Sequence, residues 1–242
     1  MAMTSRVELT VIISGGFSLA YRSVLPEFER ITGITVATAS ASSQGTGPKT
    51  MKAQLEGGAR PDVVILSREG LSELMAAGRI LSGTDVDLAR VPIGAAVRMA
   101  QAKPDLDAVD GFKRALLNAR AIAVPGSTSG IFLMKEVFPR LGLAEKILVK
   151  VGARGADATA LVAAGEADIV LAPVSELVNV AGIEYVGRVP QEVQLLQVFA
   201  AAVVAGSDRC DEAKRLIEFL ASAQTAAAIE QSGMEPLGLR RG

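Results

Sequence analysis

The chain has 242 residues, half of them hydrophobic, which is enough for one large or two small domains with a buried core. Its 25 Lys and Arg residues nearly balance 26 Asp and Glu residues, so no net field is expected to recruit nucleic acid or an anionic membrane. There is no histidine and one cysteine, which excludes a Ser-His triad, an intramolecular disulfide and a cysteine cluster for a metal. We therefore expect neither a metal nor a cofactor.

The first part of the chain alternates strand-length apolar runs with helix-period segments, a rhythm typical of parallel sheets flanked by helices. Strands are predicted over 8–13, 34–39 and 62–66, and helices over 18–32, from Pro48 to Gly57, and from the third strand to Ala77. Pro26 lies inside the first helix and is expected to kink it or mark a late restart.

A second α/β series begins after Val91, because the strand-like run 92–99 is followed by new units rather than by a return to the first series. Those units are a helix from Asp110 to Asn118, a strand over 121–124, a helix opening at Gly130, a strand over 147–151, a helix over 156–164, a strand over 168–171 and a short helix near 174–179. The run 193–204 is long enough to cross back, and helices from Asp208 to Ala221 and from about Gln224 follow. We predict two discontinuous lobes, 1–92 with 197–242 and 93–196.

Four predicted loops carry small hydroxyl and glycine residues where a strand leads into a helix. They are Ser14-Gly15-Gly16-Phe17-Ser18, Ser42-Ser43-Gln44-Gly45-Thr46, Ser127-Thr128-Ser129-Gly130 and Pro173-Val174-Ser175. Ligands of open parallel sheets bind at this edge, where glycine admits backbone N–H groups and the helix start adds partial positive charge. One such loop alone is more simply an ordinary helix cap. Four of them, two from each lobe, predict a cradle for a small anion.

Four segments carry a family resemblance. They are residues 11–19 (VIISGGFSL), 28–36 (FERITGITV), 54–67 (QLEGGARPDVVILS) and 165–170 (GEADIV). In this order they resemble the periplasmic molybdate-binding proteins over nearly the whole chain. The resemblance implies an α/β fold of the type II periplasmic-binding-protein kind, with a ligand cleft between two lobes. Each lobe would hold an open, mostly parallel sheet with flanking helices, and two hinge crossings would join them.

The resemblance also implies hydroxyl and amide donors from Ser14 and Ser18 in the first loop and from Ser42, Ser43 or Thr46 in the second. Molybdate binders usually have a tyrosine after the strand of the fourth segment, but this chain has Pro173, which cannot donate an N–H. That departure points to another anion, such as a small carboxylate. The predicted ligand-binding residues are Ser14, Gly16, Phe17, Ser18, Ser42, Ser43, Thr46, Ser67, Arg68, Ser127, Thr128, Ser129, Pro173 and Ser175.

Charged residues near these loops bear on the ligand. Lys49 and Arg68 are placed to face the cleft, where an arginine fork would hold a carboxylate; the alternative for each is a solvated surface charge. Arg154 and Glu176 are weaker candidates, placed only by their nearness to loops of the second lobe. Arg98 is expected to brace the hinge.

Two functions stay open. The first is a solute-binding protein that closes on an anion by hinge motion. The second follows from the resemblance, whose relatives include isomerases of unsaturated polycarboxylates such as aconitate; it would use Lys49 and Glu176 as catalytic groups, because the chain lacks histidine. Nothing reads as a coiled coil or repeat, so a structural role is not favoured.

The N-terminal residues bear on location. The apolar run 7–13 is too short for the core of a signal peptide, and no stretch of about 18 apolar residues is present for membrane insertion. The chain as written is expected in the cytoplasm, or in the periplasm if a leader has been removed. An ABC permease would be a partner only if the protein is exported.

Overall fold

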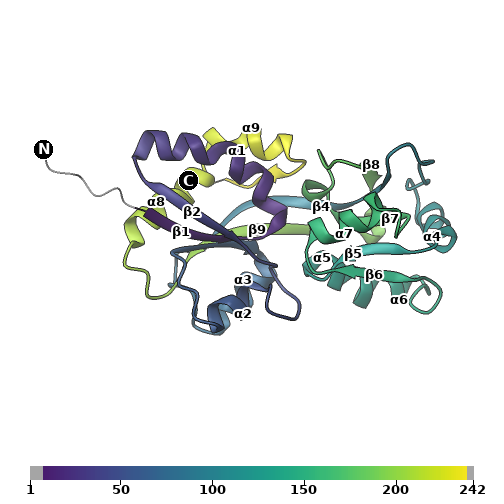
Figure 1. The fold of residues 1–242 in the computed structure, drawn as a ribbon, viewed down its shortest axis with the longest axis horizontal. Coiled ribbons are helices and arrows are strands. Elements are labelled where there is room, and N and C mark those ends of the chain that lie inside the picture. The colour runs from purple at the N-terminus through teal and green to yellow at the C-terminus, as the bar shows by residue number, and fades with distance from the viewer. Residues whose placement is uncertain (1–7, 239–242) are drawn as a thin grey trace, which may run out of the picture.

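A computed structural model of the chain describes residues 8–238. It has two lobes. In Figure 1 the long strands β4 (Val86–Arg98) and β9 (Leu196–Val203) run from one lobe to the other. The backbone ladder is continuous through both lobes, in the order β2-β1-β3-β9-β4-β7-β5-β6. It forms a mixed sheet with helices on its faces.

The first lobe is built on β1 (Glu8–Ile13), β2 (Thr35–Ser40) and β3 (Val63–Ser67), which run parallel. Its helices are α1 (Gly15–Thr32), α2 (Met51–Glu56), α3 (Arg68–Ala76), α8 (Cys210–Leu220) and α9 (Ala226–Gln231), with the 3-10 turn η4 (Ala223–Thr225) before α9. Figure 1 shows α1, α8 and α9 over one face of this sheet and α2 and α3 over the other. Side chains along each strand therefore alternate between two apolar layers: Ile13 packs with α1 and α8, while Ile12 packs with α2 and α3.

The second lobe contains β5 (Ile122–Pro125), β6 (Val149–Gly152), β7 (Ile169–Pro173) and β8 (Ile183–Arg188). Its helical segments are α4 (Val109–Asn118), α5 (Thr128–Phe132), the π-helical turn η1 (Leu133–Val137), α6 (Phe138–Arg140), α7 (Gly155–Ala163) and the 3-10 turns η2 (Val174–Glu176) and η3 (Gln191–Val193). One face of the sheet packs on Phe112 and Phe138, and the other packs on the small side chains of α7.

Strand β4 changes partners along its length. Residues from Val86 to Pro92 pair with β9, and those from Ile93 onward pair with β7 and β8. The Gln194 side chain joins the two crossings at this point: its Oε1 accepts from Ile93 N at 2.6 Å, and its Nε2 donates to Ile93 O at 3.0 Å. The two segments that cross between the lobes are thus joined by the hydrogen bonds of one glutamine amide.

Several helix and strand bounds in the structure differ from those predicted from the sequence. The crossing strand starts at Val86 rather than at residue 92, because its first residues pair with β9 despite the charged Asp87 and Arg90. Helix α1 starts at Gly15, directly after β1, and runs through Pro26 to Thr32 without a break. Strand β8 and the two-residue β10 (Glu235–Pro236), which pairs with β4, were not predicted. Within residues 8–238, no helix combines the length and apolar character needed to cross a membrane.

Candidate functional site

A pocket of about 330 Å³ lies where the two lobes meet. We call it the inner pocket; it is lined by Ser14, Gly15, Gly16, Ala41, Ser42, Ser43, Pro125, Ser127, Ser129, Arg154, Gly155, Pro173, Glu176, Gln197 and Phe199. These residues follow β1, β2, β5, β6 and β7 or lie on β9, so the carboxyl ends of parallel strands from both lobes meet here. Only about 20 Å³ of this space is wide enough for a water-sized molecule, so a larger ligand needs the lobes to move apart.

Two helices of substantial length begin at this pocket. Helix α1 starts at Gly15 and α7 at Gly155, and their first backbone N–H groups have no partner within the helix. Ser14 stands at the N-cap of α1, but its side chain makes no cap hydrogen bond. The partial positive charge of two helix starts and a free serine hydroxyl therefore face one small space.

Glycine at three positions makes this space possible. A Cβ on Gly16 would lie 2.0 Å from Phe199 Cζ. A Cβ on Gly15 would lie 2.3 Å from Glu176 Oε1, and one on Gly155 would lie 2.2 Å from Glu176 Cδ. The Glu176 carboxyl thus lies in a gap between the starts of α1 and α7, and any larger residue at position 15 or 155 would fill this gap.

Glu176 is the acidic residue of the inner pocket. The residue is half-buried in the wall of the pocket, and burial raises the pKa of its carboxyl from 4.5 to about 7. No hydrogen bond or ion pair joins its side chain to another of residues 8–238, because the neighbouring Arg154 guanidinium binds Asp157 at 3.3 Å. The helix starts favour the ionised form and oppose the shift, so both protonation states are accessible near neutral pH.

Three buried side-chain oxygens in the described part of the chain lack a hydrogen-bond partner in the protein: Ser14 Oγ, Gln197 Oε1 and Ser175 Oγ. Ser14 and Gln197 line the inner pocket. Ser175 lines a second pocket that shares Gly15, Ala41, Arg154 and Glu176 with the first. Buried polar groups are normally bonded, so their gathering at two adjoining pockets marks the place where a polar ligand would complete the structure.

Contacts between the lobes close around the inner pocket. The Ser42 hydroxyl donates to the Ala153 carbonyl at 2.8 Å. Ser67 Oγ and Thr128 Oγ1 lie 2.7 Å apart, and Thr128 donates to Gln44 Oε1 at 2.8 Å. The lobes are therefore in contact along the rim, as in a closed form of the cleft.

The sequence model of the bacterial extracellular solute-binding proteins matches residues 9–235 of this chain. The chain belongs to that family. Aconitate isomerase from Pseudomonas sp is 36% identical to it over 230 residues, a match that covers 95% of this chain and 88% of the relative.

Solved structures share the fold of this chain. The sulfate-binding protein SubI from Mycobacterium tuberculosis H37Rv matches with a TM-score of 0.75 at 18% identity, covering 96% of this chain and 87% of that one. The Azotobacter vinelandii periplasmic molybdate-binding protein matches with a TM-score of 0.70 at 20% identity, covering 93% of this chain and 98% of that one. The predicted type II periplasmic-binding-protein fold is confirmed, and the chain shares it with a periplasmic molybdate-binding protein.

The family fold brings half of the predicted ligand-binding residues to the inner pocket. They are Ser14, Gly16, Ser42, Ser43, Ser127, Ser129 and Pro173. Glu176 and Arg154, the weaker candidates, also line it, because the loops after β6 and β7 end there. Ser18 and Ser175 line the adjoining second pocket instead.

Other predicted residues lie elsewhere. Phe17 is 1% exposed and packs in the core of the first lobe, since the side chain at this turn of α1 faces the sheet. Ser67 and Thr128 are occupied by their mutual contact at the rim. Thr46 and Lys49 are exposed and line neither pocket, although their loop contacts the second lobe through Ser42.

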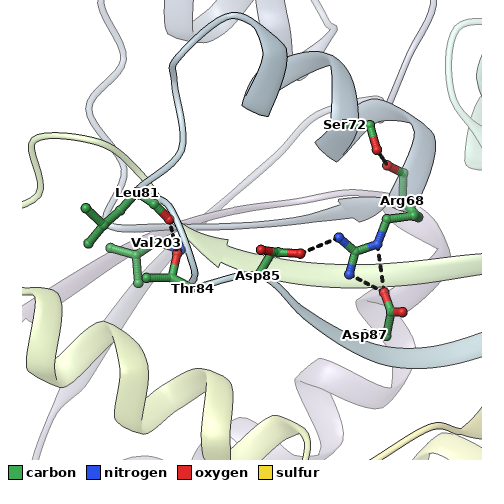
Figure 2. A network of polar contacts seen from close by, with 7 residues as sticks. All are labelled: Arg68, Ser72, Leu81, Thr84, Asp85, Asp87 and Val203. Carbon is green, nitrogen blue, oxygen red and sulfur yellow. Dashed lines mark hydrogen bonds and ion pairs between the residues drawn. The ribbon is translucent and has the colours of Figure 1, made fainter.

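Arg68 does not face the inner pocket. Its guanidinium donates from Nη1 to Asp85 Oδ2 at 2.7 Å and from Nε to Asp87 Oδ1 at 2.8 Å, with a further ion pair from Nη2 to Asp87. Figure 2 shows this guanidinium held between the two aspartates at the start of β4. The expectation that Arg68 faces the cleft is corrected by these partners, and Arg154 is the arginine that lines the pocket.

The predicted site residues omit six that line the pocket: Gln197, Phe199, Gly155, Gly15, Ala41 and Pro125. The first two lie on β9, which was interpreted only as a crossing strand. A buried glutamine in an otherwise apolar strand is the signal that was available, because such an amide needs partners. Among the described residues, no group of three or more acidic or cysteine side chains could hold a metal ion.

Proposed function

We propose that the inner pocket binds a small unsaturated polycarboxylate, such as aconitate, and moves a proton along its carbon skeleton. The protein would then be a cofactor-independent isomerase. The observation that carries this proposal is the unpaired Glu176 carboxyl between two helix starts. The 36% identity to an aconitate isomerase over nearly the whole chain supports the same substrate class.

Glu176 favours catalysis over passive binding. An ionised carboxyl beside an anionic ligand repels it, so a pure anion receptor gains nothing from burying one without a partner. With a pKa of about 7, the same group can take a proton from carbon when ionised and return it when neutral. It is therefore matched to proton transfer near neutral pH.

The rest of the pocket suits the carboxylates of such a substrate. The N–H groups at the starts of α1 and α7, the free Ser14 hydroxyl and the Arg154 guanidinium all can donate to carboxylate oxygens. These donors also stabilise charge that spreads onto a carboxylate during reaction.

The proposed reaction is an allylic proton shift. Ionised Glu176 removes a proton from the CH2 carbon beside the double bond, and the electron pair left behind delocalises over three carbons and their carboxylates. Neutral Glu176 then delivers the proton to the former vinylic CH carbon, so the double bond moves by one position. Every proton and electron pair is conserved, and no oxidant or cofactor is required.

The test is isomerisation of trans-aconitate followed by proton NMR in deuterated water. We expect appearance of the cis isomer with the unchanged protein, and loss of at least about a hundredfold in rate with Glu176→Gln, given that general base catalysis contributes ~10²–10⁴-fold. Glu56→Gln, at an exposed glutamate on α2, is the matched control. Absence of both isomerisation and deuterium exchange would overturn the proposal for this substrate.

A solute-binding role without chemistry is the second candidate, and the family membership together with the closed rim favours it. Calorimetric binding of trans-aconitate with no conversion would select it. Such a receptor would work in the periplasm with an ABC permease, whereas the isomerase would need neither. In both cases we propose that residues 1–92 with 197–242 close on 93–196, which the change of partners in β4 after Pro92 supports.

A further inference from the structure

The second pocket at the cleft, which we call the outer pocket, has its own polar lining. It spans about 930 Å³ of space that is partly open to solvent, and it is bordered by α1, α7 and η2. Its polar residues include Ser18, Arg22, Arg154, Thr159, Ser175 and Asn179. Glu176 and Arg154 line both pockets, so they stand in the wall between them.

Ser175 gives the first reason to expect a ligand in the outer pocket. It is 4% exposed, and its hydroxyl has no partner in the protein. Leaving a buried hydroxyl unbonded costs about 1–3 kcal/mol, a cost that a bound acceptor would remove. A serine kept in this state beside a cavity points to an acceptor that arrives from solution.

Charge gives the second reason. Arg22, on the second turn of α1, makes no hydrogen bond or ion pair with any of residues 8–238, so its charge is free to bind an anion. Arg154 adds a second guanidinium to the same lining. Among the described residues that line this pocket, Glu176 is the only acidic one, and its carboxyl is half neutral at about pH 7. The outer pocket therefore presents one unpaired cation, Arg22, a second guanidinium that is already paired with Asp157, and a free hydroxyl.

We propose that the outer pocket is a second carboxylate-binding site, in which Arg22 and Arg154 bind the carboxylate and Ser175 donates a hydrogen bond to it. The carboxylate belongs either to a polycarboxylate whose other end occupies the inner pocket, or to a second molecule on its way to that pocket. This inference rests on the proposed carboxylate ligand but not on the proton shift.

Titration calorimetry with tricarballylate, a saturated tricarboxylate that cannot isomerise, tests the site. We expect Arg22→Gln to weaken binding by about tenfold, since it removes one charge-assisted contact at a partly solvated position. Arg30→Gln, an exposed arginine on the same helix outside both pockets, is the matched control and should change affinity by less than about twofold. A binding stoichiometry of one indicates a single ligand across both pockets, and a stoichiometry of two indicates separate molecules.

Sulfate and Ser175→Ala sharpen the result. Sulfate, as a single small oxyanion for the inner pocket, should bind Arg22→Gln and the unchanged protein equally. Ser175→Ala should weaken tricarballylate binding without lowering the melting temperature, because the hydroxyl has no partner in the protein. The inference is overturned if tricarballylate does not bind, if both variants bind it like the unchanged protein, or if Arg22→Gln weakens sulfate equally.

The two proposals fail in different ways. If trans-aconitate is not isomerised but Arg22→Gln and Ser175→Ala weaken tricarballylate binding, the proton shift is wrong and the outer site stands. If trans-aconitate is isomerised while both variants bind tricarballylate normally, the outer site is wrong and the proposed reaction stands.

Discussion

Replacing Glu176 with glutamine tests the burial of its carboxyl through stability rather than through activity. The folded protein holds the proton of Glu176 up to a pKa of about 7, whereas the unfolded chain releases it near 4.5. Below about pH 4 both states are protonated, and the carboxyl adds no pH dependence. Between the two pKa values the folded state binds more protons, so the free energy of unfolding falls as pH rises.

The magnitude follows from the size of the shift. About 2.5 pH units at ~1.36 kcal/mol each give about 3 kcal/mol of stability lost between about pH 4.5 and 7. Glutamine has the same shape and stays neutral at every pH. Glu176→Gln should therefore become more stable than the unchanged protein as pH rises, by up to about 3 kcal/mol at about pH 8, with the gain constant above that.

Urea unfolding followed by circular dichroism at several pH values measures this difference. The chain has no tryptophan, which makes circular dichroism the natural probe. Glu56→Gln, at an exposed site, should give no pH-dependent gain. Parallel stability profiles for Glu176→Gln and the unchanged protein would refute the argument, because they would mean that the folded state ionises Glu176 as readily as the unfolded chain does.

Three further substitutions test other parts of the structure. Gly16→Ala would place a methyl carbon 2.0 Å from the Phe199 ring, so we expect the affinity for tricarballylate to fall at least tenfold. Calorimetry measures this affinity, and an unchanged value would show that the ring can move aside. Gln194→Ala removes the hydrogen bonds that join the backbone of Ile93 to the second crossing. It should lower the free energy of unfolding, measured with urea, by about 1–3 kcal/mol. No loss would mean that water replaces the amide. Arg68→Gln should change ligand affinity by less than about twofold. It should lower the free energy of unfolding by about 1 kcal/mol or less, because the partners of Arg68 are two half-exposed aspartates. A large loss of affinity would place this arginine in the site after all.

The order of strands and helices and most of the inner pocket follow from local patterns. Ser14, Ser42, Ser127 and Pro173 all lie at strand ends or within two residues after them, and parallel strands of one lobe bring their carboxyl ends to one edge. Small hydroxyl residues in those loops therefore predict the site without knowledge of distant contacts. Their role toward a ligand remains a proposal.

The direction of charged side chains depends on residues far away in the chain. Arg68 and Arg154 both follow strand ends, yet Arg68 finds Asp85 and Asp87 at the start of β4 while Arg154 stays at the pocket. Arg154 has a local partner in Asp157, three residues further on, whereas Arg68 pairs only with aspartates distant in sequence. The position of Gln197 in the pocket could not be predicted from local sequence for a similar reason. Only the antiparallel pairing of β9 between β3 and β4 brings this residue to the cleft.

Binding of an unsaturated carboxylate beside Glu176 is the central claim, and a crystal structure of Glu176→Gln with trans-aconitate tests it most directly. The account predicts electron density in the inner pocket, with a ligand carboxylate within hydrogen-bond distance of the starts of α1 and α7 and of Ser14, and a ligand carbon against residue 176. An empty inner pocket at saturating ligand, or density only on the outer surface of one lobe, would contradict it.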